Sequence, residues 1–216
     1  MITFQSGDKT IRLDQIEPAG PGPFPAVLLV HGSGGNISFW LDSIAPFITR
    51  LGVALYAVHY FERTGTIRAD TATILDGVHV PLWLDTLSDA LEAIAARPTV
   101  NPRRIALLGI SLGAFLSLAH ATLPNRRRVR AIVEVSGGLD GDYIAGATAT
   151  FPPTLILHGE QDTIVPVSRA RTLDDLLTRL DIPHQIQLFP NEGHHFSPTA
   201  QLRILQATAT FLGKRL

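Results

Sequence analysis

The sequence predicts an α/β fold in which helices cover both faces of a mostly parallel, eight-stranded sheet. Short, continuous apolar runs alternate with longer segments of helical periodicity along most of the chain. Strands that are buried on both faces of a parallel sheet and joined by helices produce this pattern. The first two strand segments instead alternate apolar and polar residues around the turn sequence Ser6-Gly7-Asp8-Lys9. They predict an antiparallel hairpin at the N-terminus.

Each element can be assigned a range in chain order. The hairpin strands are expected at 2–5 and 10–16, and the six buried strands at 26–30, 53–58, 105–108, 131–135, 154–157 and 185–189. Helices are expected at 39–50, 82–96, 112–123, 168–180 and 198–212. The longer connections are 60–81 and 137–153, and the second is far too short for a cap domain. Because no repeat or linker interrupts the pattern, we expect one domain, residues 1–216, without a cap.

Composition narrows the class of protein. The chain is 45% apolar and 17% charged, with a formal net charge of -1, as in an ordinary folded enzyme. A protein that relies on phosphate contacts normally carries a basic excess, so we expect no nucleic-acid partner. The one basic cluster, Arg126-Arg127-Arg128 with Arg130, is interpreted as a solvated loop.

The absence of cysteine and the character of the N-terminus limit the possible kinds of catalysis and the expected location in the cell. The sequence contains no cysteine, which excludes disulfides, thiolate catalysis and cysteine-based metal sites. The N-terminal residues lack the pattern of a secretory signal, and no apolar run is long enough to span a bilayer. We therefore expect a cytoplasmic protein with no membrane partner, present as a monomer or a homodimer.

The segment Gly109-Ile110-Ser111-Leu112-Gly113 lies where a predicted strand ends and a helix begins. A serine on such a turn is held in a strained conformation, and the flanking glycines relieve crowding around it. The backbone N–H of Leu112 opens the helix and can stabilise an oxyanion. These features predict Ser111 as a catalytic nucleophile.

A serine nucleophile needs a base and a carboxylate that orients the base. Asp162 lies in the loop after the predicted strand 154–157, and His194 lies after the next strand, 185–189. Because parallel strands end at the same edge of a sheet, we expect Ser111, Asp162 and His194 to form a triad. Two alternatives stay open: His195 adjoins His194, and Glu160 lies two residues before Asp162.

A second oxyanion donor is expected in His31-Gly32-Ser33-Gly34-Gly35, which follows the strand 26–30. The predicted donor is the backbone N–H of Ser33, with Gly34 as the alternative. The glycines fit neither the Lys-containing nor the dinucleotide phosphate-binding pattern. The eight histidines do not show the spacing of a metal site, so we expect neither a metal nor another cofactor.

Taken together, these motifs resemble the dienelactone hydrolase family of the α/β-hydrolases. The resemblance extends from about Phe24 to the end of the chain. It is carried by Val30-His31-Gly32-Ser33-Gly34-Gly35, Leu51-Gly52-Val53, Val58-His59-Tyr60-Phe61-Glu62-Arg63-Thr64-Gly65, Gly109-Ile110-Ser111-Leu112-Gly113, His158-Gly159-Glu160-Gln161-Asp162 and Gly193-His194-His195-Phe196.

The resemblance implies an α/β-hydrolase fold and the same triad. It also implies that Arg63 and Tyr60 contact the substrate, since an arginine near this loop holds a substrate carboxylate in relatives. The best-known members use a cysteine nucleophile supported by a glutamate in the oxyanion loop. Here serine replaces that cysteine, and the loop has no acid.

The sequence therefore predicts a serine hydrolase that cleaves small carboxylic esters or lactones through an acyl-enzyme. Two other functions remain open at this stage. An acyltransferase would use the same triad, with an alcohol or thiol in place of water. A non-catalytic binding module could keep the scaffold alone.

Overall fold

The computed structural model describes residues 1–216 and contains one eight-stranded sheet. The strand order across the sheet is β1-β2-β4-β3-β5-β6-β7-β8. The strands are β1 (Ile2–Ser6), β2 (Lys9–Ile16), β3 (Phe24–Val30), β4 (Ala54–Val58), β5 (Val100–Ile110), β6 (Ile132–Val135), β7 (Thr154–Gly159) and β8 (His184–Phe189). From β4 to β8 every neighbouring pair is parallel, whereas β2 pairs antiparallel with both β1 and β4. The predicted sheet and N-terminal hairpin are thus confirmed.

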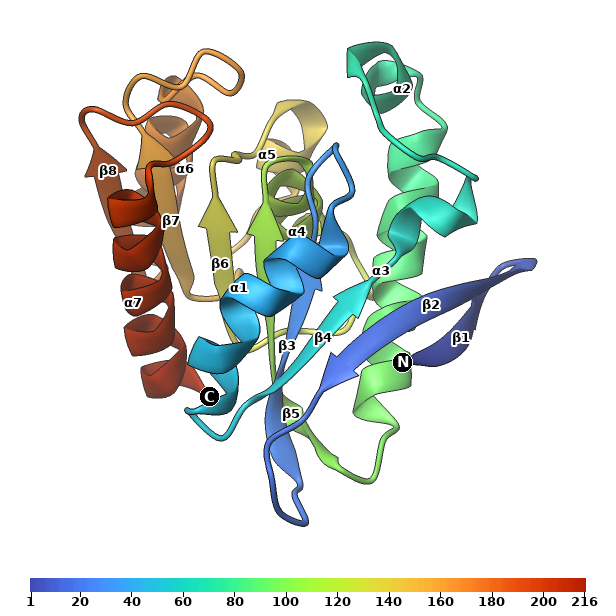
Figure 1. Ribbon diagram of the computed structural model, residues 1–216. Helices are drawn as coiled ribbons and strands as arrows, with labels where there is room; N and C mark the ends of the chain where they lie inside the picture. Colours follow the sequence, from blue (N-terminus) through green and yellow to red (C-terminus); the bar gives the residue numbers. More distant parts are fainter.

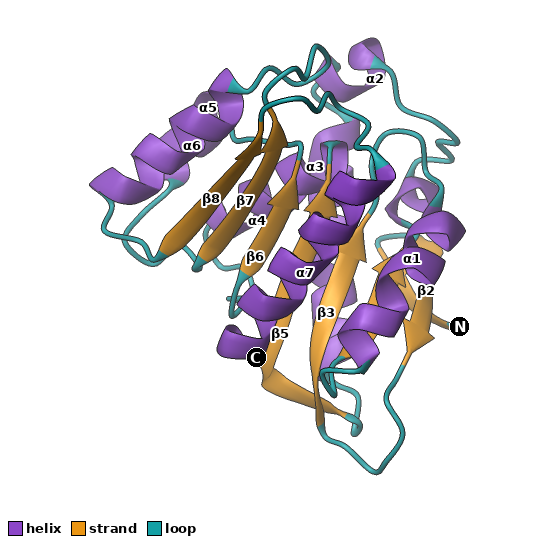
Figure 2. Ribbon diagram, turned by 60° about the vertical axis from the view of Figure 1, so that its left-hand side comes forward, coloured by secondary structure: helices purple, strands orange, loops and turns teal.

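Helices cover both faces of the sheet (Figures 1 and 2). The helices are α1 (Ile37–Thr49), α2 (Thr71–Leu75), α3 (His79–Ala95), α4 (Leu112–Thr122), α5 (Gly141–Gly146), α6 (Ser168–Arg179) and α7 (Pro198–Arg215), with a short 3-10 turn at Tyr60–Arg63. Helices α1 and α7 pack on one face, and α3, α4 and α6 pack on the other. None of the helices combines the length and apolar character needed to cross a bilayer.

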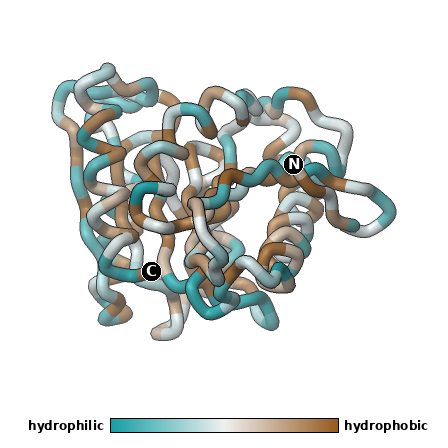
Figure 3. The backbone as a smooth tube through the Cα atoms, turned by 60° about the horizontal axis from the view of Figure 1, so that its bottom comes forward, coloured by the Kyte–Doolittle hydropathy of each residue, from teal (hydrophilic) through white to brown (hydrophobic).

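Alternate residues of the central strands supply two separate apolar cores. In β3, Ala26, Leu28 and Val30 join the core beneath α3 and α4, while Val27 and Leu29 join the core beneath α1 and α7. This two-sided burial explains why the central strands read as continuous apolar runs. In Figure 3, many of the hydrophilic segments lie in loops at the periphery of the chain.

The structure extends several predicted elements. Helix α3 begins at His79, before Pro81, because the first turn of a helix tolerates a proline. Strand β5 begins at Val100, which pairs with Phe24 ahead of a register shift. The two long connections contain the 3-10 turn Tyr60–Arg63, the first residues of α3 and the short helices α2 and α5. Helices α2 and α5 lie near the carboxyl edge of the sheet (Figure 1). No cap domain covers that edge, as predicted.

Candidate active site

Ser111 occupies the turn between β5 and α4 with φ 54° and ψ −117°. A positive φ is strained for a residue with a side chain, and it is typical of a nucleophile held for attack. The neighbouring chain is too close to accommodate side chains on either flank. An added Cβ would lie 2.3 Å from the Gly113 oxygen at position 109, and 2.0 Å from the Val30 oxygen at position 113. Both positions therefore require glycine.

The loops after β5, β7 and β8 meet at the carboxyl edge of the sheet (Figure 1) and bring three predicted side chains together. The Nε2 atom of His194 lies 3.0 Å from the Ser111 hydroxyl oxygen. The Nδ1 atom of His194 lies 2.8 Å from Oδ2 of Asp162. Because an ionised carboxylate only accepts hydrogen bonds, Nδ1 carries the proton and Nε2 accepts from the serine. In this arrangement the Ser111 hydroxyl donates its hydrogen bond to the Nε2 atom of His194.

Asp162 is fixed on its other side by its own loop. Its side chain is 0% exposed, and Oδ1 accepts hydrogen bonds from the backbone N–H groups of Ile164 (2.9 Å) and Val165 (2.8 Å). The carboxylate therefore closes a turn and contacts His194 with its second oxygen.

Backbone contacts join the loop of the acid to the loop of the histidine. The Gln161 N–H donates to the Glu192 oxygen at 2.9 Å. An added Cβ at Gly159 would lie 2.4 Å from that oxygen and 2.5 Å from the oxygen of Gly193. The Gly159 position thus allows the two loops to approach closely enough for Asp162 to reach His194.

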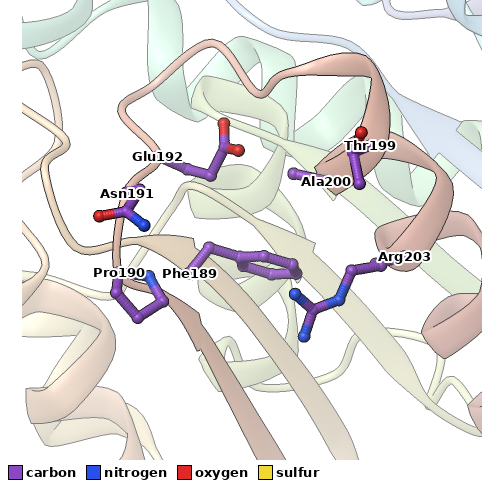
Figure 4. A pocket seen from close by; sticks show the side chains of 7 residues that line it. All are labelled: Phe189, Pro190, Asn191, Glu192, Thr199, Ala200 and Arg203. Carbon is purple, nitrogen blue, oxygen red and sulfur yellow. The ribbon is translucent and has the colours of Figure 1, made fainter.

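The histidine loop is also closed by its own side chains. The Glu192 carboxylate accepts from the Ser197 N–H at 2.7 Å and from the Ser197 hydroxyl at 2.5 Å. Beside this contact lies a hollow of about 110 Å³ on the outer side of the loop (Figure 4). Arg203 lies over the Phe189 ring there, 5.3 Å from its centroid. These contacts hold both ends of the loop that carries His194.

The alternative residues take other places. His195 lines the cleft, with its ring centroid 5.5 Å from that of His194, but it makes no hydrogen bond to Ser111. Glu160 forms an ion pair with Arg171 at 2.9 Å and does not contact His194. Among the candidates, only His194 and Asp162 complete a hydrogen-bonded chain with the serine.

Two backbone N–H groups are free near the serine. Neither Leu112, the first residue of α4, nor Ser33 donates a hydrogen bond from its backbone N–H within the protein. The loop of Ser33 lies close to Ser111: an added Cβ at Gly32 would be 3.3 Å from the Cβ of Ser111. Ser33 is held in turn by the Ala69 N–H, which donates to its carbonyl at 3.0 Å.

His31 and Tyr60 support this loop from below. The two rings stack with centroids 4.2 Å apart, and the Tyr60 hydroxyl donates to the His31 carbonyl at 2.9 Å. His31 Nδ1 donates to the Gly32 oxygen at 2.8 Å. Burial lowers the pKa of His31 to about 4, so the ring remains neutral near pH 7.

A cleft of about 540 Å³ opens beside Ser111 and His194. The loop 32–36, helix α1 and helix α7 supply much of its lining, including the aromatic side chains of Phe39 and Trp40. Arg68 is the only lysine, arginine, aspartate or glutamate that lines it. No group of three or more acidic or histidine side chains in the structure could hold a metal ion.

Arg63 and Tyr60, the expected substrate contacts, do not line the cleft. Arg63 packs against Gly7 and pairs with Asp8 in the β1–β2 turn. Tyr60 is fully buried, with its hydroxyl on the His31 carbonyl at the start of the loop that carries Ser33. The arginine that does reach the cleft is Arg68, which the long connection 60–81 brings there.

Sequence reasoning also missed Ser136, a cleft-lining residue that directly follows β6, the neighbour of β5. Its φ is 53°, it is 1% exposed, and its hydroxyl has no hydrogen-bond partner. Ser111 and Ser136 directly follow the paired residues Ile110 and Val135, which end adjacent strands. Both serines have a positive φ. The only sequence signal was a serine directly after an apolar strand.

The parallel sheet and the serine, histidine and aspartate at its carboxyl edge define an α/β-hydrolase. Solved structures agree on the fold. The dienelactone-hydrolase-like promiscuous phosphotriesterase P91 from metagenomic libraries superimposes with a TM-score of 0.83 at 20% identity, covering 99% of this chain and 96% of its own. Dienelactone hydrolase from Anabaena variabilis gives 0.79 at 18% identity, covering 100% and 96%.

The family model of the dienelactone hydrolase family matches residues 14–210, and the chain belongs to that family. Acyl-coenzyme A thioesterase 1 of Mus musculus is 27% identical over 150 residues, which cover 69% of this chain and 33% of the relative. Acyl-coenzyme A thioesterase 5 of the same species is 27% identical over 186 residues, or 84% and 40%. The chain thus spans about a third of the length of these curated relatives.

Proposed function

We propose that this protein is a serine hydrolase that cleaves small carboxylic esters or lactones through an acyl-enzyme. The observation that carries the proposal is the hydrogen-bonded chain from Asp162 through His194 to the strained Ser111. Nucleophile, base and orienting acid are within hydrogen-bond reach of one another, which is the geometry that acyl transfer needs.

In the first step, the Ser111 oxygen attacks the ester carbonyl while His194 Nε2 takes the hydroxyl proton. The free N–H groups of Leu112 and Ser33 stabilise the oxyanion. The tetrahedral intermediate then collapses, and the C–O bond to the alcohol breaks. His194 returns its proton to the departing oxygen, and the acyl group remains on Ser111.

In the second step, water attacks the acyl-enzyme while His194 takes its proton. Collapse releases the carboxylic acid, and the proton returns to Ser111. Asp162 holds the Nδ1–H tautomer of His194 and stabilises the imidazolium that forms in both steps. For a lactone the same bond cleavage opens the ring, and the alcohol stays attached to the acid.

Kinetics on p-nitrophenyl acetate test the proposal. We expect Ser111→Ala and His194→Ala each to lower kcat by at least about 10³-fold, and Asp162→Asn by a comparable factor. The matched control is His195→Ala, which removes the adjacent imidazole and is expected to retain most of the activity. Full activity in Ser111→Ala would contradict the proposal.

The other two functions are separate outcomes of this test. Excess alcohol acceptor that diverts the acyl group to a new ester faster than water does would indicate an acyltransferase. No turnover by the wild type, with no modification of Ser111 by a fluorophosphonate, would indicate a binding module.

A thioester is a second candidate substrate, favoured by the similarity to acyl-coenzyme A thioesterases. The same acid is assayed as its p-nitrophenyl ester and as its coenzyme A thioester. A higher kcat/KM on the thioester, lost in Ser111→Ala, would favour this candidate.

A further inference from the structure

The cleft does not end at Ser111 but continues between the sheet and the helices α1 and α7. These two helices contact each other on the same face of the sheet (Figures 1 and 2). The side chains that line this deeper part come from β5, α1 and α7: Ile44, Leu108, Ile110, Ile204, Leu205 and Thr208. We call this part the α1–α7 pocket.

The depth of the α1–α7 pocket follows from helix and strand geometry. Leu108 precedes Ser111 by three positions on β5, or about 10 Å at about 3.3 Å per residue. Thr208 follows Gln201, which also lines the cleft, by seven positions on α7, or about 10 Å at about 1.5 Å per residue. Helix α7 descends from the edge to which β5 rises (Figure 2). By these spacings, Leu108 and Thr208 are the lining residues of β5 and α7 that lie farthest along their elements from that edge.

The chemistry of the pocket is apolar. Leu108 and Thr208 both line the cleft, and each is only 2% exposed. The one charged side chain of the cleft, Arg68, is exposed to solvent. Transfer of an apolar chain from water into the pocket is therefore favourable, and it does not desolvate a buried charge.

We propose that the α1–α7 pocket receives a straight aliphatic chain of the substrate and that Thr208 limits the length of that chain. This inference rests on the proposed function, because the chain must be attached to the ester that Ser111 attacks. The chain can belong to the acyl group or to the alcohol. In both cases the substrate class is an uncharged aliphatic ester.

Two substrate series test the wild-type protein. The acyl series is p-nitrophenyl acetate, butyrate, hexanoate, octanoate and decanoate, and the alcohol series is the acetates of ethanol, butanol, hexanol and octanol. Burial of each methylene predicts that kcat/KM rises about fourfold per methylene in one series. The rise stops where the chain reaches Thr208, and longer chains react more slowly. The series that shows the rise identifies the chain that occupies the pocket.

Variants of Thr208 test the limit on length. Thr208→Leu enlarges the side chain at this position, so the ratio of kcat/KM for the longest good substrate to that for acetate falls at least tenfold. Thr208→Ala makes the side chain smaller and moves the optimum to a longer chain. Because the alanine variant relieves packing, it keeps the proposal testable if the leucine variant fails to fold.

The control lies on the same helix. Leu202 is 48% exposed and does not line the cleft, so Leu202→Phe should leave the chain-length profile unchanged. Flat profiles in both series, or an optimum that neither Thr208 variant moves, would overturn the inference. Such a result would leave the proposed function standing if acetate hydrolysis still depended on Ser111. If acetate hydrolysis did not depend on Ser111, both this inference and the proposed function would be wrong.

Discussion

The buried ring of His158 lies against the carboxylate of Asp162, with Nε2 3.4 Å from Oδ2. The same nitrogen lies 2.8 Å from the Val165 carbonyl oxygen, to which it donates. Burial lowers the pKa of His158, which favours the neutral ring over the charged one. His158 therefore ties β7 to the far end of the turn that holds Asp162.

Substitution of His158 should loosen that turn. His158→Phe leaves the Val165 carbonyl without a donor, and we expect the free energy of unfolding to fall by about 1–3 kcal/mol. We expect kcat to fall roughly tenfold to a hundredfold at similar KM, because small displacements of catalytic groups are costly. His158→Gln, which retains an N–H donor, should lose less of both. Urea unfolding and ester kinetics measure these effects, and a phenylalanine variant with wild-type kcat would contradict this role.

A second prediction concerns Gly159, where the loop that carries Asp162 packs closely against the loop that carries His194. Gly159→Ala places a Cβ against two backbone oxygens at 2.4 and 2.5 Å, so the loops must separate. We expect kcat to fall by about a hundredfold or more, as for a displacement of about 1 Å. Gly213→Ala is the matched control, because its Cβ meets only a leucine side chain at 4.0 Å. That control should be at least as stable as the wild type. Equal activity of the two variants would refute the prediction.

A third prediction follows from the carboxyl group of Glu134, buried in β6. Its Oε2 accepts from the Gly137 N–H at 2.9 Å, and its Oε1 has no partner. Burial raises the pKa of Glu134 to about 8 from its ordinary value of 4.5. Between these values the folded protein keeps a proton that the unfolded chain releases. The free energy of unfolding therefore falls as pH rises through this window, by at most about 1.4 kcal/mol per pH unit.

Glu134→Gln removes this titration. The stability of the variant relative to the wild type should increase steadily as pH rises from 4.5 to 8. Burial also lowers the pKa of His31 and of His120 to about 4. The wild type and the Glu134→Gln variant therefore both lose stability as pH falls below the ordinary histidine pKa of 6.5. Because that loss is common to both proteins, the difference between their urea midpoints isolates Glu134. A pH-independent difference would contradict the prediction.

Much of the fold was predictable because local pattern and global burial agree. Strands such as β3 are apolar throughout, since both of their faces are covered. The three residues of the serine site were predictable because parallel strands place their carboxyl ends on one edge. Short helices such as α2 were not predicted. Helix α2 has no fully buried side chain, so its sequence lacks the apolar periodicity by which a helix is recognised.

The substrate contacts were less predictable than the residues around Ser111. Arg63 and Arg68 lie in the same connection, and only the path of the chain decides which one reaches the cleft. The pairing of Arg63 with Asp8 joins residues that are distant in sequence. The position of Thr208 in the cleft could not be predicted from the sequence either, because it depends on the packing of α7 near β5 and α1.

Covalent labelling tests most directly the central claim that Ser111 is the nucleophile. The protein is treated briefly with a fluorophosphonate, digested, and mapped by mass spectrometry. The account predicts one labelled peptide containing Ser111, no label in Ser111→Ala, and much slower labelling in His194→Ala. A label on another residue, or undiminished labelling of Ser111→Ala, would contradict it.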